Sequence, residues 1–335
     1  MKKLISLICV LAMVLALAAC GSSAPAAATE APAASTEAPS ADVSTDKTFV
    51  VGICQLVQHP ALDAATQGFK DALTEALGDK VTFQEQNASG DSATCSLICN
   101  QFVSDEVDLI MANATASIQA AASATNTIPI LGTSITEYGV ALGIDNFTGT
   151  VGGNISGTSD LAPLDQQAQM IVDLFPSYKI VGLLYCSAEP NSQYQIKVVR
   201  AELERRGLTT KEYTFSDTND VAAVAQKASE DCEVLYIPTD NTAASCAPTI
   251  YSSMTRKVPV VCGDTGTLRG CGVAALSTSY YELGMVTGKM AAKILKGEAK
   301  VGEMPIEYAS AVKVYNPVIC EELQLRMPAD YQALD

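Results

Sequence analysis

Residues 49–77, FVVGICQLVQHPALDAATQGFKDALTEAL, decide the fold class of this chain. The first five are apolar and mostly β-branched, which predicts a buried strand. A helix is expected to begin at Pro60, because proline suits the first turn of a helix. Leu62, Phe69 and Leu73 then recur at helical spacing. A strand that leads through a short polar loop into an amphipathic helix is the repeating unit of parallel α/β structures.

The same unit repeats along the chain and predicts two open parallel sheets, one in each half. In the first half, further strands are expected at 81–83, 107–111 and 128–131, with helices at 92–104 and 116–124. After a Gly- and Asn-rich stretch at 143–157, strands are expected at 179–185, 212–215, 234–237 and 258–261, with helices at 166–175, 192–206, 220–230 and 243–253. The predicted fold class is therefore α/β, with two Rossmann-like lobes.

Composition and charge restrict the class of protein. Of 335 residues, 48% are hydrophobic and 17% charged, a globular balance that suits two ordinary domains. After the first 19 residues, no uncharged apolar stretch approaches membrane-spanning length. The formal net charge of −16 repels phosphate backbones, so nucleic acid is not an expected partner.

The first 47 residues predict export and tethering. Residues 1–19 combine two lysines with a short apolar run, as in a secretory signal peptide. The sequence LAACGS at 17–22 resembles the lipobox of bacterial lipoproteins, which implies cleavage before Cys20, a lipid on that cysteine and a place outside the cytoplasm on the cell membrane. An ordinary signal peptide with a chance cysteine is the alternative. Residues 20–47, rich in Ala, Pro, Ser and Thr, are expected to form a flexible linker.

The cysteines do not predict a disulfide framework or a metal site. Of eleven cysteines, Cys9 lies in the leader and Cys20 is the lipidation candidate, which leaves an odd number of nine. Most of these occupy positions where a small apolar residue would serve, so we expect them to be reduced. His59 is the single histidine, which argues against a zinc site. No metal and no cofactor are expected.

The loops after the predicted strands hold the candidate ligand-binding residues, because ligands bind open α/β sheets at the carboxyl ends of the strands. The first half contributes Gln55, His59, Ala114, Thr115, Thr133 and Ser134. The second half contributes Tyr185, Asn191, Ser192, Asp240, Asn241 and Asp264. A helix N-terminus offers N–H groups to a carboxylate, and a fixed aspartate holds an ammonium, so the pattern suits a zwitterion.

Several of these candidates have a purely structural alternative. Asp240, Asn241 and Thr115 lie at predicted helix starts, where such side chains cap the helix. His59 could equally cap or orient the helix that follows it. Tyr185 could stack on an aromatic ligand or pack inside a lobe.

Two catalytic motifs are absent or incomplete. Asp264-Thr265-Gly266 has the letters of the aspartic-protease triplet, but that chemistry needs two such carboxylates and no second copy occurs, so a turn is expected there. The glycines at 149–157 do not make a dinucleotide fingerprint, and there is no P-loop. Nucleotide hydrolysis is therefore not expected of this chain.

Four segments carry a resemblance to a known family. They are ICQLVQHPALD (53–63), FVSDEVDLI (102–110), YIPTDNT (236–242) and YYELGMVTGKMA (280–291). Together they resemble the ABC-transporter substrate-binding family that includes tryptophan- and tyrosine-binding lipoproteins, over residues 48 to the C-terminus. The resemblance implies a type I periplasmic-binding-protein fold, in which two lobes joined by three crossovers close on a ligand.

The resemblance also implies domain boundaries and one more site residue. The crossovers are expected near 156–160, 275–279 and 306–310. Lobe 1 would comprise 48–158 plus 280–306, and lobe 2 would comprise 159–279 plus 307–335. Asp160, at the first crossover, is expected to contact the ligand, and capping of the next helix is the alternative.

The sequence thus predicts a monomeric, membrane-anchored solute-binding protein of an ABC importer. It would capture a small zwitterion, an aromatic or other apolar amino acid, by hinge closure and deliver it to the permease without covalent chemistry. A sugar or nucleoside ligand on the same fold is one alternative. An exported hydrolase that uses a cysteine with His59 is another.

Overall fold

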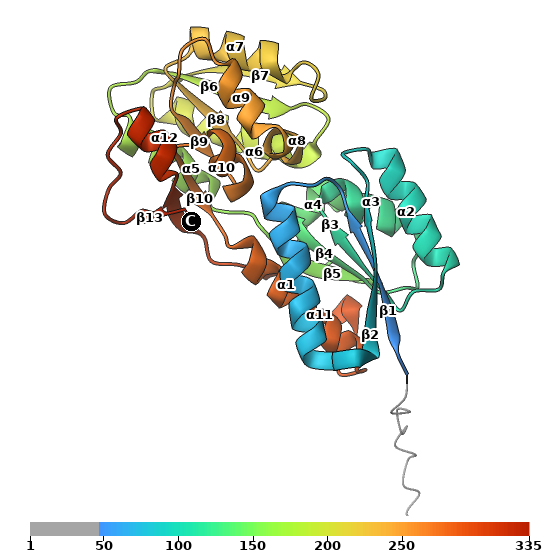
Figure 1. Cartoon of the computed structure of the whole chain (residues 1–335). Helices are drawn as coiled ribbons and strands as arrows, with labels where there is room; N and C mark the ends of the chain where they lie inside the picture. The colour runs from blue at the N-terminus through green and yellow to red at the C-terminus, as the bar shows by residue number, and fades with distance from the viewer. Residues whose placement is uncertain (1–46, 335) are drawn as a thin grey trace, which may run out of the picture. The chain divides into compact units, whose positions relative to one another are not determined.

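The computed structural model describes residues 47–334. The predicted leader, Cys20 and all but the end of the predicted linker lie outside the described residues. Within the described part, no helix combines the length and the apolar character that crossing a membrane requires. Two mainly parallel sheets with helices packed around them make up this part (Figure 1), which confirms the predicted α/β class.

The first sheet of the described part has six strands in the order β11-β5-β4-β3-β1-β2, and all of its pairs are parallel. Its strands are β1 (Phe49–Gln55), β2 (Val81–Asn87), β3 (Leu109–Asn113), β4 (Ile130–Ile135), β5 (Ile155–Ser159) and β11 (Glu307–Tyr308). Its helices are α1 (Pro60–Leu77), α2 (Ser92–Ser104), α3 (Thr115–Ala124), α4 (Tyr138–Leu142) and α11 (Tyr280–Leu295), with short 3₁₀ turns η1 (Gly78–Lys80) and η2 (Val301–Glu303). We call this sheet and these helices the first lobe.

The second sheet has seven strands in the described part, in the order β13-β12-β10-β9-β8-β6-β7. Its strands are β6 (Ile180–Cys186), β7 (Thr209–Phe215), β8 (Val234–Ile237), β9 (Val260–Cys262), β10 (Ala274–Ser277), β12 (Val312–Tyr315) and β13 (Gln332–Ala333). Its helices are α5 (Leu164–Leu174), α6 (Pro190–Arg205), α7 (Val221–Asp231), α8 (Asn241–Ser245), α9 (Ala247–Ser253), α10 (Thr265–Cys271) and α12 (Pro317–Glu322). The β10–β12 pair is antiparallel, unlike the others. This sheet and its helices form the second lobe.

The chain passes between the sheets after β5, after β10 and after β11. Strand β11 pairs with β5, with Glu307 opposite Thr158 and Tyr308 opposite Ser159. The first sheet therefore runs one residue past the predicted boundary at 158/159 and two residues past the one at 306/307, because β11 pairs with the end of β5. The division into lobes at 158/159, 279/280 and 306/307 otherwise stays a prediction.

Helices α1 and α11 pack with their backbones in contact, which closes the first lobe (Figure 1). A Cβ added to Gly284 would lie 2.0 Å from the carbonyl oxygen of Ala65, and one added to Gly68 would lie 2.1 Å from that of Tyr281. Gly288, one turn further along α11, meets the carbonyl oxygen of Phe69 in the same way. The glycines in segment 280–291 are thus explained by close helix packing.

Three local predictions were wrong. The turn expected at Asp264-Thr265-Gly266 is the start of α10, with Asp264 as its N-cap. The single helix expected at 243–253 is two helices, α8 and α9, which are separated at Cys246, where φ is −124°. The stretch before the first crossover contains the short helix α4, capped by Glu137, where no helix was predicted.

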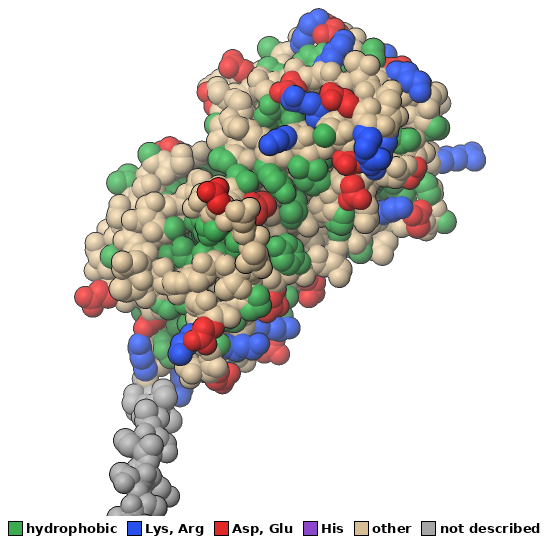
Figure 2. Space-filling view, turned by 180° about the vertical axis from the view of Figure 1, so that it is seen from behind, with side chains coloured by type: hydrophobic (Ala, Val, Ile, Leu, Met, Phe, Trp, Pro, Cys, Tyr) green, Lys and Arg blue, Asp and Glu red, His purple; other side chains and the backbone are tan. Residues whose placement is uncertain are grey.

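The surface carries both signs of charge. Figure 2 shows acidic and basic side chains interspersed on the face that it presents, with hydrophobic side chains between them. The negative net charge is therefore not gathered into a single patch on this face.

Candidate functional site

The site is built at the carboxyl ends of the strands in both sheets. Gln55 ends β1, but its side chain is fully used inside the first lobe. Its Nε2 donates to the carbonyl of Val57 at 3.0 Å and to Asp63 Oδ1 at 2.7 Å, and its Oε1 accepts from Thr66 Oγ1 at 2.6 Å. Gln55 therefore fixes the loop after β1 and is not free to bind a ligand.

Helix α3 presents an N-terminus without a side-chain cap. Its N-cap is Ala114, at φ 92° and ψ 163°, a backbone conformation that is nearly restricted to glycine. Ala114 N–H donates to the carbonyl of Thr133, which fixes the turn, and Thr115 follows, also buried. The strained turn aims the free N–H groups of a ten-residue helix into the site.

Strand β4 adds two buried hydroxyls next to this helix start. Thr133 Oγ1 accepts from Thr158 Oγ1 at 3.3 Å, so it belongs to a network inside the lobe. Ser134 is in the left-handed region at φ 56°, and its buried Oγ has no hydrogen-bond partner among the described residues. Burying such a hydroxyl without a partner is costly, which marks Ser134 as a group that another molecule can satisfy.

Asp160 lies at the first crossover, where the chain leaves β5. Its Oδ2 accepts from the Tyr280 hydroxyl at 2.8 Å, whereas its buried Oδ1 has no partner in the described part of the chain. Burial raises the pKa of Asp160 to about 6, and hydrogen bonds from Tyr280 and Thr136 oppose the rise. Half of this carboxylate is therefore held in place and half is free to receive a cation.

Glu189, which was not among the predicted residues, organises the second lobe's side of the site. Its Oε1 accepts from Thr242 N at 2.8 Å and from Thr242 Oγ1 at 2.7 Å. Its Oε2 accepts from Asn241 N and Nδ2 and from Asn191 Nδ2, at 2.8–3.1 Å. The carboxylate thereby ties the start of α6 to the start of α8 and leaves Asn191 Oδ1 buried without a partner in the described residues.

Asp240 is a helix cap. Its Oδ1 accepts from Ala243 N at 2.8 Å, and its Oδ2 accepts from Cys186 N at 2.7 Å and from Ser192 Oγ at 2.8 Å. Burial raises its pKa well above the ordinary value, and the nearby Glu189 carboxylate adds to the rise. Both oxygens of Asp240 are therefore used within the second lobe, and the helix-capping alternative for this residue is what the structure shows. Ser192 belongs to the same hydrogen-bond network.

Asp264 caps α10 in the same way. Its oxygens accept from Thr267 N at 2.8 Å and from Thr267 Oγ1 at 2.7 Å. Burial raises the pKa of Asp264 to about 6, with a further contribution from Asp160. The two carboxylates therefore lie near each other although they belong to different parts of the fold.

His59, the N-cap residue of α1, is where the first lobe meets the second. Its side chain does not cap α1, and neither ring nitrogen has a hydrogen-bond partner in the part that the structure describes. Burial lowers its pKa, and Asn241 and Glu189 of the second lobe partly oppose this shift. The imidazole is therefore neutral and buried against the second lobe.

A hollow of about 240 Å³ opens beside these groups, and both lobes line it. From the first lobe it is lined by Leu56, Val57, Ser89, Gly90, Ser92 and Ala116, and from the second by Cys186, Ala188, Glu189, Ser216, Asp217, Thr218, Asn241, Thr242 and Ser245. Of the predicted residues, only Asn241 lines it directly. The other lining residues were not predicted, because they come from loops and helix starts of both lobes that are far apart in the sequence.

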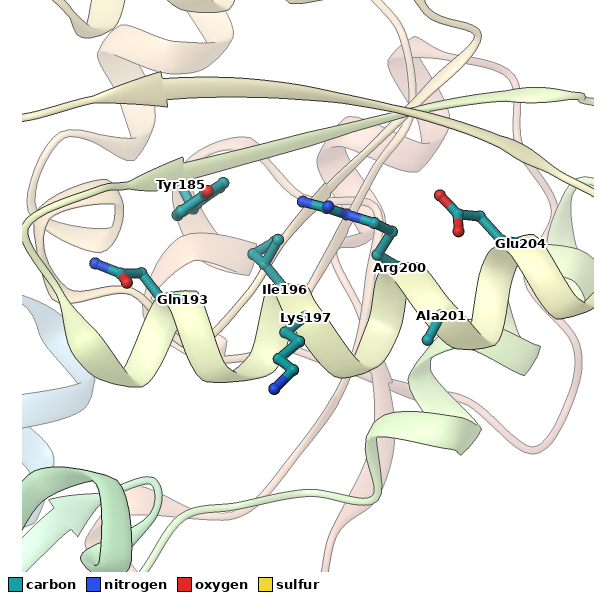
Figure 3. Close-up of a pocket in the computed structure, with 7 residues that line it drawn as sticks. All are labelled: Tyr185, Gln193, Ile196, Lys197, Arg200, Ala201 and Glu204. Carbon is teal, nitrogen blue, oxygen red and sulfur yellow. The ribbon is translucent and has the colours of Figure 1, made fainter. Parts of the chain in front are cut away.

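Tyr185 does not join the other candidates. Its hydroxyl donates to Glu212 Oε2 at 2.9 Å, and Glu212 also pairs with Arg200. Figure 3 shows Tyr185 on β6 opposite side chains of α6, where it lines a separate hollow of about 360 Å³ within the second lobe. Alternate residues of a strand point to opposite faces, and Tyr185 points to the face covered by α6.

The arrangement does not assemble a thiol catalyst. His59 accepts no hydrogen bond from a cysteine among the described residues, and burial raises the pKa of Cys186 and of Cys320 to about 11. A thiolate is the reactive form of cysteine, so these thiols are held in the unreactive form. The described residues also contain no group of three His, Cys, Asp or Glu side chains placed to hold a metal ion.

Comparisons with known proteins find similar chains. The chain is 34% identical over 260 residues to a "Tyrosine-binding protein" of Clostridioides difficile strain R20291, covering 76% of this chain and 75% of that one. It also matches an ABC domain in complex with L-Trp from Streptococcus pneumonia, at a TM-score of 0.81 and 32% identity, covering 86% of this chain and all of that one.

A third similar structure is open and contains no ligand. The ligand-free, open structure of a substrate-binding protein with adhesive properties from Clostridium difficile matches at a TM-score of 0.66 and 34% identity, over 86% of this chain and 99% of that one. At nearly equal identity, the TM-score is thus higher against the L-Trp complex than against the open structure. A family model described as "ABC transporter substrate binding protein" matches residues 50–332, and the chain belongs to this family.

Proposed function

We propose that this substrate-binding protein captures an aromatic amino acid outside the cytoplasm and delivers it to the permease of an ABC importer. The observation that carries the proposal is a set of buried polar atoms, contributed by both lobes, that have no hydrogen-bond partner among the described residues: Ser134 Oγ, Asp160 Oδ1, Asn191 Oδ1 and the His59 ring nitrogens. Such atoms are rare in folded proteins unless a ligand or water satisfies them. The named relatives, a tyrosine-binding protein and an L-Trp complex, indicate the class of ligand.

Each part of an amino acid has a matching group. The carboxylate is proposed to bind the uncapped N-terminus of α3 at Thr115, where N–H groups and the helix dipole favour an anion, with Ser134 Oγ beside it. The ammonium is proposed to bind Asp160 Oδ1, which Tyr280 holds in place. The side chain is proposed to enter the hollow beside Leu56 and Ala116.

Closure follows from the division of these groups between the lobes. A ligand that contacts both lobes binds the shut arrangement better and shifts the population toward it. Moving from 1:99 to 99:1 requires a differential affinity of about 5.5 kcal/mol. Two or three charge-assisted hydrogen bonds, at about 1.5–3 kcal/mol each, supply that amount. No covalent step is part of this function.

Isothermal titration of the purified protein with L-tyrosine and L-tryptophan tests the ligand, with D-glucose and uridine as the alternatives. Binding of an amino acid but not of the sugar or nucleoside is expected, since the site pairs an anion-binding helix start with a free carboxylate oxygen. Binding of glucose or uridine alone would contradict the proposal.

The lipid anchor is tested separately. We propose that Cys20 is the lipidated N-terminus of the mature chain, which acts as a monomer above the membrane. Mass spectrometry of the N-terminal peptide from membranes is expected to show diacylated Cys20, and Cys20→Ala is expected to release the protein from the membrane fraction. An unmodified cysteine in membrane-bound protein would contradict the anchor.

A further inference from the structure

Gly266, in the first turn of α10, lies close to a residue of the first lobe. A Cβ added to Gly266 would lie 3.0 Å from Asp264 Oδ1, 3.1 Å from His59 Nδ1 and 3.4 Å from the Cβ of Ala244. Asp264 and Ala244 belong to the second lobe, whereas His59 belongs to the first. The imidazole and the capping carboxylate thus face each other across the space of one methyl group.

The backbone does not demand a glycine at this position. Gly266 is not among the residues with positive φ, and it lies inside a helix, where alanine is the better residue. Within the second lobe, Ala244 is at an ordinary contact distance, whereas Asp264 Oδ1 is close and is held by its hydrogen bond from Thr267 N. From the first lobe, the close neighbour is Nδ1 of His59, a buried residue that follows strand β1 through a loop fixed by Gln55.

We propose that Gly266 is the position that permits the lobes to shut, because its missing side chain admits the His59 ring against the first turn of α10. The inference rests on the proposed function in one respect, namely that shutting traps the ligand. It adds a residue that touches no ligand but sets how far the two lobes can approach. A side chain at position 266 keeps the His59 ring away from α10 and holds the two lobes partly open.

The test compares two identical substitutions in one helix. Gly266→Ala adds a methyl group toward the other lobe. Gly270→Ala adds one that meets Ala247 Cβ at 2.5 Å and Pro248 Cδ at 2.9 Å, wholly inside the second lobe. Affinity for L-tyrosine and L-tryptophan is measured by titration calorimetry, and the thermal midpoint of the ligand-free protein is measured for each variant.

The two variants are expected to behave in opposite ways. Gly266→Ala should keep or raise the ligand-free midpoint and bind about tenfold or more weakly, since overpacking a tight contact opposes closure. Gly270→Ala should lower the midpoint and keep an affinity near that of the wild type. In a His59→Ala background, adding Gly266→Ala should cost much less than it does alone, because the ring that it would meet is gone.

Equal affinity of Gly266→Ala and wild type would overturn the inference, as would an equal loss in both glycine variants or full additivity with His59→Ala. If the wild type binds neither amino acid, the ligand assignment is wrong. The contact between His59 and Gly266 is then tested by small-angle X-ray scattering of freshly purified protein, with any co-purified small molecule still bound. The wild type should then scatter as the shut structure and Gly266→Ala as a more extended one. Identical scattering of the two proteins would overturn the contact.

Discussion

Replacing Asp160 by asparagine separates two effects of its buried charge: the effect on the free energy of unfolding and the effect on ligand affinity. The asparagine keeps the shape of the side chain and an oxygen that can accept from the Tyr280 hydroxyl, but it never carries a charge. Asp160 is 3% exposed, and burial raises its pKa from 3.8 to about 6. The ionised carboxylate is therefore less favourable in the ligand-free folded protein than in the unfolded chain.

The size of the effect follows from the pKa. A rise from 3.8 to about 6 corresponds to about 3 kcal/mol at pH values above 6. Below pH 4 both states are protonated and the term vanishes, so the wild type loses this stability as the pH rises from about 4 to about 6. Asp160→Asn should match the wild type near pH 4 and exceed it at pH 8 by up to about 3 kcal/mol. Asp264 contributes its own loss over the same range, and the difference between the two proteins also includes the part of the Asp264 shift that Asp160 causes.

Ligand binding should change in the other direction. If an ammonium faces Asp160 Oδ1, the asparagine loses a charge-assisted hydrogen bond worth about 1.5–3 kcal/mol, which weakens binding roughly 10- to 150-fold. Urea unfolding of the ligand-free protein at pH 4, 6 and 8 and calorimetry with L-tyrosine measure the two effects. Asp264→Asn is the control, because Asp264 accepts from Thr267 and its loss weakens a helix cap. An asparagine variant that is no more stable at pH 8, or that binds as tightly as the wild type, would refute this account of Asp160.

Three further outcomes are expected. Ala114→Gly should raise the free energy of unfolding by about 1 kcal/mol, because relief of the strained conformation exceeds the entropic cost of glycine; a lower stability in urea would contradict the strain. Gly284→Ala should destabilise the first lobe by about 3 kcal/mol or more, since its methyl group would meet the Ala65 carbonyl; an unchanged thermal midpoint would speak against the backbone contact. A thiol reagent should label at most Cys246 in the native protein and all nine body cysteines after unfolding, because the other eight are buried; rapid labelling of several native thiols would show that they are accessible.

The sequence predicted the elements that depend on strong local patterns. The strand at 234–237 and the helix at 92–104 have the predicted bounds, because one is a short apolar run and the other is bracketed by Asp91 as N-cap and a polar end. Helix α10 was missed because it is short and carries glycines at 266 and 270, which give no helical signal. Short edge strands such as β11 depend on a partner far away in the sequence.

The site was predicted less well, for a related reason. Sequence indicates which polar residues follow a strand, but not whether the backbone around them uses their oxygens. Asp240 and Asp264 are both helix caps, whereas Asp160 keeps one oxygen free, and the three look alike in the sequence. Glu189 was missed because its carboxylate joins the starts of α6 and α8, through a hydrogen bond to Asn241, which is 52 residues away in the sequence.

The packing of α1 against α11 also dictates an order of assembly. The Tyr281 hydroxyl donates to Asp71 across 210 residues of sequence, so the first lobe, although its chain is synthesised first, cannot be completed until nearly the whole polypeptide has emerged. Strands β6 to β10 and their helices are continuous in the chain and need no such distant partner. Contacts between distant segments form slowly. Strands β6 to β10 and their helices are therefore expected to pack together early, before β12 and β13 complete the second sheet, whereas the first lobe waits for α11 with an apolar helix face uncovered.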